Sequence, residues 1–104
     1  MKQIKLDPTV RKEQLLDAAL RISEQRGYMT ASRDDVAAMA GCAASLVSYH
    51  FGTMPNLRRA IMSAAIDRKN LTVLAQGLAM GESKAKAAPA ELRAAAVEFA
   101  SRAE

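Results

Sequence analysis

The chain has 104 residues, half of them apolar and a quarter charged, and its net charge is +4, with nine basic against six acidic residues in the first sixty. This length allows one small domain with a modest core, and the single Cys42 excludes an internal disulfide. No apolar run is long enough to span a membrane, and the start lacks the apolar middle of a secretory signal, so we expect a cytoplasmic protein.

The first predicted helix runs from about 8 to 26. Asp7 can cap it, proline follows at the first helical position, and apolar residues recur at helical spacing up to a glycine. A short second helix is predicted over 33–40. Ser32 can cap this helix, and Asp35 can complete the cap as the acidic residue of a capping box does.

A third helix is predicted from the residues that follow. Gly41 can take the left-handed conformation that ends the second helix, and residues 44–50 are again helix-compatible. Thr53 can cap a fourth helix. That helix is expected to be long, because after Asn56 the residues at alternating four- and three-residue steps are apolar as far as Leu78, with Arg68 as the one exception.

The end of the chain contains a predicted linker and one more helix. Residues 81–89 mix small and charged side chains around a proline, and residues 90–103 form an alanine-rich amphipathic pattern. We expect an all-α fold with a helix-turn-helix domain at 1–53. A truncated dimerisation region, made of the long fourth helix and the C-terminal helix, would occupy 54–104.

The second and third helices have the pattern of a helix-turn-helix. Small Ala37 fits a close crossing of the two helices, and apolar Val47 would lie behind the second. Small residues at the start of that helix would let its backbone approach DNA bases, and polar residues at its end could meet base edges or phosphates. The same spacing also fits an ordinary short helix packed in a bundle.

Three stretches resemble the N-terminal DNA-binding domain of TetR-type transcriptional regulators. They are "LLDAALRISEQRGY", "DDVAAMAG" and "SLVSYHFGTMPNL", and the likeness runs without gaps from Arg11 to Ile61. The resemblance implies a three-helix domain whose third helix reads the major groove of double-stranded DNA. It also implies a long fourth helix that leads to a dimerisation and ligand domain.

The resemblance carries the family's DNA contacts over to ten positions. Helix N-termini favour a phosphate through their free amides, although capping alone would explain the serine and threonines among the ten that lie there. Arg33 opposes the dipole of its helix, which favours a phosphate partner. The ten positions are Thr30, Ser32, Arg33, Ala43, Ala44, Ser45, Ser48, Tyr49, His50 and Thr53.

The chain also departs from the family. Ala43 and Ala44 replace the usual serine and lysine, Met54 replaces a lysine, and Ser23 replaces a large aromatic residue. We therefore expect a thinner core and weaker nonspecific DNA binding. Specificity would depend on Ser45, Ser48, Tyr49 and His50.

Family members are usually longer, and few residues remain here after the fourth helix begins. We expect no small-molecule inducer, because a ligand cavity needs walls from several helices. Unpartnered apolar residues predict a homodimer, although a hairpin folded back onto the domain would cover them too. The predicted interface consists of Leu71, Leu74, Leu78, Leu92 and Phe99.

The leading interpretation is a homodimeric repressor that reads a palindromic operator. The alternative is a helical protein-interaction module that keeps the fold and has lost DNA binding. We predict no enzyme and no cofactor, because Cys42 and His50 are the only candidates for a nucleophile pair. No further His or Cys exists to build a metal site.

Overall fold

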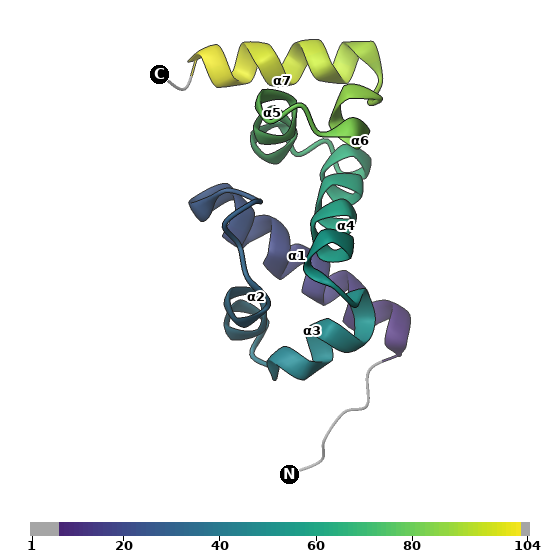
Figure 1. Ribbon diagram of the computed structural model, residues 1–104. Coiled ribbons are helices and arrows are strands. Elements are labelled where there is room, and N and C mark those ends of the chain that lie inside the picture. The colour runs from purple at the N-terminus through teal and green to yellow at the C-terminus, as the bar shows by residue number, and fades with distance from the viewer. Residues whose placement is uncertain (1–6, 103–104) are drawn as a thin grey trace.

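The computed structural model describes residues 7–102, in which the chain forms seven α-helices and no strand (Figure 1). The all-α prediction is confirmed. The molecule is elongated, about 47 × 24 × 22 Å, with α2 and α3 at one end and α7 at the other. The helices are α1 (Pro8–Arg26), α2 (Arg33–Ala40), α3 (Ala44–Phe51), α4 (Met54–Asp67), α5 (Leu71–Ala79), α6 (Ser83–Lys86) and α7 (Ala90–Arg102).

The predicted caps fix the first three helices. The Asp7 carboxylate accepts from the amide of the second residue of α1 at 2.8 Å. Ser32 and Asp35 form the reciprocal capping box, each amide donating to the other side chain at 3.1 Å. The hydrogen bond from the Ser32 amide lowers the pKa of the Asp35 carboxyl. Gly41 has φ 73° and ends α2 in the left-handed region, as predicted.

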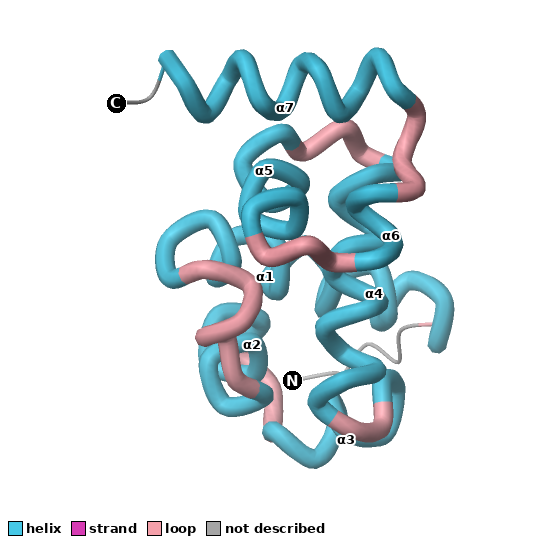
Figure 2. Tube along the Cα trace, turned by 45° about the horizontal axis from the view of Figure 1, so that its top comes forward, coloured by secondary structure: helices cyan, strands magenta, loops and turns pink. Residues whose placement is uncertain are grey.

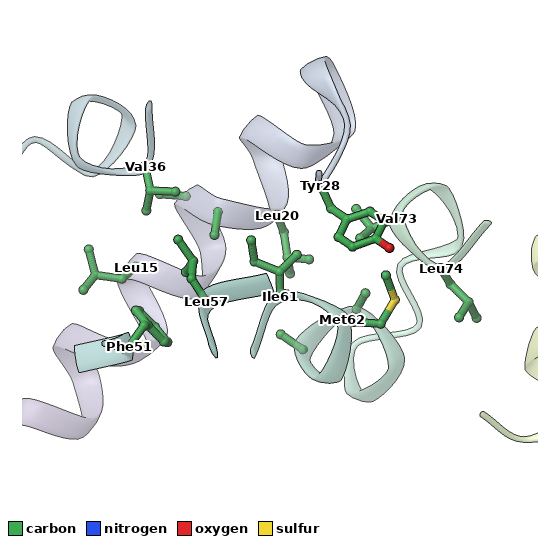
Figure 3. Packing of buried hydrophobic residues seen from close by; sticks show 14 of the residues in the cluster. Leu15, Leu20, Tyr28, Val36, Phe51, Leu57, Ile61, Met62, Val73 and Leu74 are labelled. Atoms are coloured by element: carbon green, nitrogen blue, oxygen red, sulfur yellow. The ribbon is translucent and has the colours of Figure 1, made fainter. Parts of the chain in front are cut away.

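The core lies where α1 crosses α4. Figure 3 shows Leu15 and Leu20 of α1 beside Leu57 and Ile61 of α4, with Val36 of α2 above them. All five side chains are buried, and each contributes about 1.5–3 kcal/mol relative to exposure. These contacts hold α2 against α1 and α4.

The prediction of one long fourth helix is wrong. The chain breaks after α4 because Lys69 has φ 56°, which a right-handed helix excludes. The Asn70 side chain then caps α5 by accepting from the amide of Val73 at 3.1 Å. The apolar spacing resumes in the same register at Leu71, so the one charged position at Arg68 does not by itself indicate a turn.

The turn sends α5 back across the end of α1. Gln76 donates its side-chain N–H to the carbonyl of Ser23 at 2.9 Å and accepts from the amide of Tyr28 at 2.8 Å. Arg68 bonds both Glu13 and Asp17 of α1. The C-terminal half is thus joined to the α1–α2 junction by polar contacts as well as by apolar packing.

Residues 81–89 are packed, so their interpretation as a plain linker is wrong in part. Glu82 caps α6 by accepting from two of its amides at 3.0 Å, and Ala85 and Ala88 are buried. A side-chain carbon at Gly77 would lie 2.9 Å from the Cβ of Ala85. Glycine at this position lets α5 and α6 approach each other.

Helix α7 lies across α5 and closes this end of the molecule (Figure 2). Leu74 is fully buried inside the chain, so the premise that it lacks a partner is wrong. Leu71, Leu78 and Leu92 are half-buried, whereas Phe99 remains 44% exposed. The packing of α7 on α5 agrees with the alternative in which the C-terminal helices fold back onto the chain. The homodimer stays a prediction.

The bonds of Gln76 generate the first testable prediction. Gln76→Ala should lower the free energy of unfolding by about 1–3 kcal/mol, because it leaves the buried amide of Tyr28 without an acceptor and removes one of the two donors to the Ser23 carbonyl, which keeps its bond from the Gly27 amide. Gln76→Glu keeps an acceptor for the Tyr28 amide but places a carboxylate oxygen beside the Ser23 carbonyl, so it should lower the free energy of unfolding as well. Urea denaturation measures both, with Gln25→Ala at an exposed position of α1 as the control. A Gln76→Ala protein as stable as the control would contradict this assignment.

Candidate functional site

Helix α3 is anchored by one face and exposes the other. Val47 is fully buried and Phe51 nearly so, and both point into the core. On the opposite face Tyr49 is 80% exposed, and Ser45, one turn earlier, is exposed as well. The apolar side fixes the helix, so the polar side is presented to solvent without contributing to the core.

A shallow hollow of about 320 Å³ lies where the first turns of α2, α3 and α4 meet. It brings together five of the ten predicted site residues from two separate helices. Asp34 and Met54 also line it, and no motif in the sequence predicts Asp34 at this place. The lining consists of Ser32, Arg33, Asp34, Ala44, Ser45, Ser48 and Met54.

Two polar contacts order this end of the molecule. Arg33 donates from Nη1 to the Oγ of Ser48 at 3.2 Å, which links the first residue of α2 to the middle of α3. Arg26 forms an ion pair with Asp35 at 2.8 Å beside the capping box. Neither contact follows from the sequence pattern, because each depends on how α2 packs against its neighbours.

The aromatic end of α3 has a cation beside it. The rings of Tyr49 and His50 meet edge to face with centroids 5.2 Å apart. The Nζ of Lys12 lies 5.7 Å from the centre of the Phe51 ring. Lys12 comes from α1, far away in the sequence, so no local motif could have identified it as a neighbour of α3.

The predicted residues at helix starts differ in their roles. Ser32 and Thr53 both act as caps, Thr53 accepting from the amide of Asn56 at 3.3 Å. Thr30 lies in the turn two residues before the Ser32 cap, so its expected place at a helix N-terminus is wrong. Ala43 precedes α3 and has no side chain that could cap it. The first amides of α3 therefore receive no side-chain cap.

Other kinds of site are not formed by the residues that the structure describes. Residues 7–102 contain no group of three His, Cys, Asp or Glu side chains that could hold a metal ion. Over the same range no helix is both long and apolar enough to cross a membrane. Cys42 is half-buried in the turn between α2 and α3.

Residues 15–61 match the profile of a known family, described as bacterial regulatory proteins, tetR family. The matched segment begins at Leu15 in α1, contains α2 and α3 with the hollow between them, and ends in α4 at Ile61. Comparison with curated proteins and with solved structures gave no match.

Proposed function

Since residues 15–61 assign the chain to the tetR family of DNA-binding bacterial regulators, we propose that it is a homodimeric repressor. Each copy places α3 in the major groove of one half of an inverted-repeat operator. The bound dimer represses transcription of the adjacent gene. Its occupancy follows the concentration of the dimer, without a small-molecule inducer.

The exposed face of α3 is the observation that carries this proposal. A major groove about 12 Å wide admits one helix, and the residues that enter must be polar or small. Ser45 and Tyr49 occupy the exposed ridge, and Ser48 and His50 flank it. A hydroxyl or imidazole at these places can bond base edges, while Ala43 and Ala44 let the backbone approach.

Among residues 7–102, two cations contact α3: Arg33 bonds Ser48, and Lys12 lies beside Phe51. The starts of α2 and α4 add partial positive charge for the phosphate contacts. The affinity should therefore fall with salt less steeply than that of a regulator with many phosphate contacts.

A second copy of the chain is proposed to cover the apolar surface of α5 and α7. A groove of about 390 Å³ between these helices is lined by Ala75, Leu78, Ala79, Val97, Ala100 and Ser101. Val97 is 58% exposed, and Phe99 lies two residues further along α7. Leu71, Leu78, Leu92 and Phe99 remain in the proposed interface, and buried Leu74 is removed from it. The groove lies at the end remote from α3, which leaves both copies of α3 free for DNA (Figure 1).

A protein-interaction module that has lost DNA binding is the second candidate. The charges around the hollow favour it, because exposed Asp34 would repel a phosphate and Ala44 supplies no cation. In this case α3 would present Tyr49 to another protein. The two candidates differ in their response to salt.

The mobility of the protein with random-sequence duplex DNA separates the two candidates. At about 50 mM salt the repressor should retard the duplex, and at about 200 mM the retardation should weaken at least tenfold through the loss of phosphate attraction. A helix bundle without DNA binding should leave the duplex unretarded at both concentrations. That outcome would reject the proposed function.

Tyr49 provides a test of the α3 face. Tyr49→Phe should weaken operator binding by about 1 kcal/mol, the usual contribution of one hydrogen bond, because only the hydroxyl is lost. The midpoint of thermal unfolding should stay unchanged, since the side chain lies outside the core. Measured binding equal to that of the wild type would exclude a hydrogen bond from the Tyr49 hydroxyl to DNA.

Val97 provides a test of the dimer. Val97→Glu should give a folded monomer, because a carboxylate in the apolar groove cannot be paired there. Ala38→Glu, at an exposed position of α2 remote from the groove, is the control and should remain dimeric. Sedimentation at micromolar concentration measures both variants. The proposal fails if the wild type sediments as a monomer, or if both variants dimerise equally.

A further inference from the structure

One side-chain hydrogen bond joins α2 to α3 within residues 7–102. It runs from Nη1 of Arg33 to Oγ of Ser48, with a length of 3.2 Å, and both residues are half-buried. The bond lies on the wall of the hollow between the two helices. Its acceptor belongs to the helix that presents the exposed polar face.

Within residues 7–102, Arg33 forms no ion pair with an acidic side chain. The ion pairs among the described residues involve Arg26, Arg68 and Arg102, and none includes Arg33. Its neighbour Asp34 lines the same hollow without an ion pair to it. The guanidinium therefore keeps its full charge and four of its five N–H donors while it contacts the serine.

The chemistry of the pair restricts what Ser48 can do. A serine hydroxyl has two acceptor lone pairs and one hydrogen, and a guanidinium can only donate. Arg33 therefore uses one lone pair and leaves the hydroxyl hydrogen and the second lone pair free. The side-chain hydrogen bonds among residues 7–102 include none in which this hydroxyl donates. A charged donor on the oxygen also strengthens the hydroxyl as a donor to a third group.

We propose that Arg33 is a positioning residue that fixes the Ser48 side chain and makes its hydroxyl a donor to one base acceptor in the major groove. This inference rests on the proposed function. Acceptors in that groove are guanine N7 and O6, adenine N7 and thymine O4. The charge-assisted hydroxyl hydrogen should therefore favour guanine, adenine or thymine over cytosine at the base position that Ser48 faces, because the N4 amine of cytosine can use only the remaining lone pair.

The test is a selection of duplex sites from a random library, followed by affinity measurements on the best site. Ser48→Ala should weaken binding about fivefold and remove the preference at one base position of each half-site. Arg33→Lys should weaken binding by a similar factor and relax the same position. Its salt dependence should stay that of the wild type, because lysine keeps the charge.

The double variant measures the coupling between the two residues. Arg33→Lys with Ser48→Ala should bind within about twofold of the weaker single variant, because both changes remove one interaction. Ser45→Ala is the matched control on α3. When it is combined with Arg33→Lys, the fold-losses of affinity of the two single variants should multiply, because the two residues act independently. The proposal would be overturned if the affinity losses of Arg33→Lys and Ser48→Ala also multiplied in the double variant. It would be overturned as well if the two single variants relaxed different base positions.

A measurement without DNA separates this proposal from the proposed function. Three-bond couplings should report one Ser48 rotamer in the wild type and an average of rotamers in Arg33→Lys, with equal melting temperatures. Unchanged couplings would overturn the positioning role even in a protein that binds DNA. A wild type that retards no duplex would overturn the proposed function, and the base contact with it.

Discussion

The reversal of the chain at Lys69 is the constraint on which the second half of the structure depends. A left-handed residue other than glycine costs about 1–2 kcal/mol. The cap by Asn70, the bonds of Arg68 to α1 and the two bonds of Gln76 accompany this turn and offset its cost. Without the turn, α5 would continue along α4 and extend away from α1.

Because the chain reverses at Lys69, the C-terminal helices pack back onto the N-terminal ones. Helix α5 packs against α1 and α4, α6 packs against both α4 and α5, and α7 lies across α5. Gln76 of α5 bonds Ser23 near the end of α1 and Tyr28 in the turn before α2. These two bonds couple the position of α5 to that of the turn that leads into α2. The exposed face of α3 and the apolar groove between α5 and α7 lie at opposite ends of one continuous core.

The sequence predicts the parts of the fold that depend on local chemistry. Ser32 with Asp35, and Gly41 after α2, mark helix ends through contacts between near neighbours, so the bounds of the first three helices agree closely with the structure. The break at Lys69 does not follow from the sequence pattern, because the apolar spacing resumes in the same register at Leu71 after a single charged position at Arg68. The packing of Ala85 was missed because small residues are typical of linkers as well as of tight contacts.

The candidate site is predicted in part for the same reason. The exposed face of α3 follows from helical spacing once Val47 is placed in the core. The bond between Arg33 and Ser48, and the position of Lys12 beside Phe51, depend on the crossing of helices from different parts of the chain. One sequence contains no signal for such pairs.

The most direct measurement of the central claim is the length and symmetry of the DNA segment that one protein complex protects from cleavage. A dimer that presents two copies of α3 should protect an inverted repeat whose half-sites are about 34–36 Å apart, or a multiple of that spacing. Uniform cleavage along the duplex at low salt, or protection of one isolated half-site, would contradict the account.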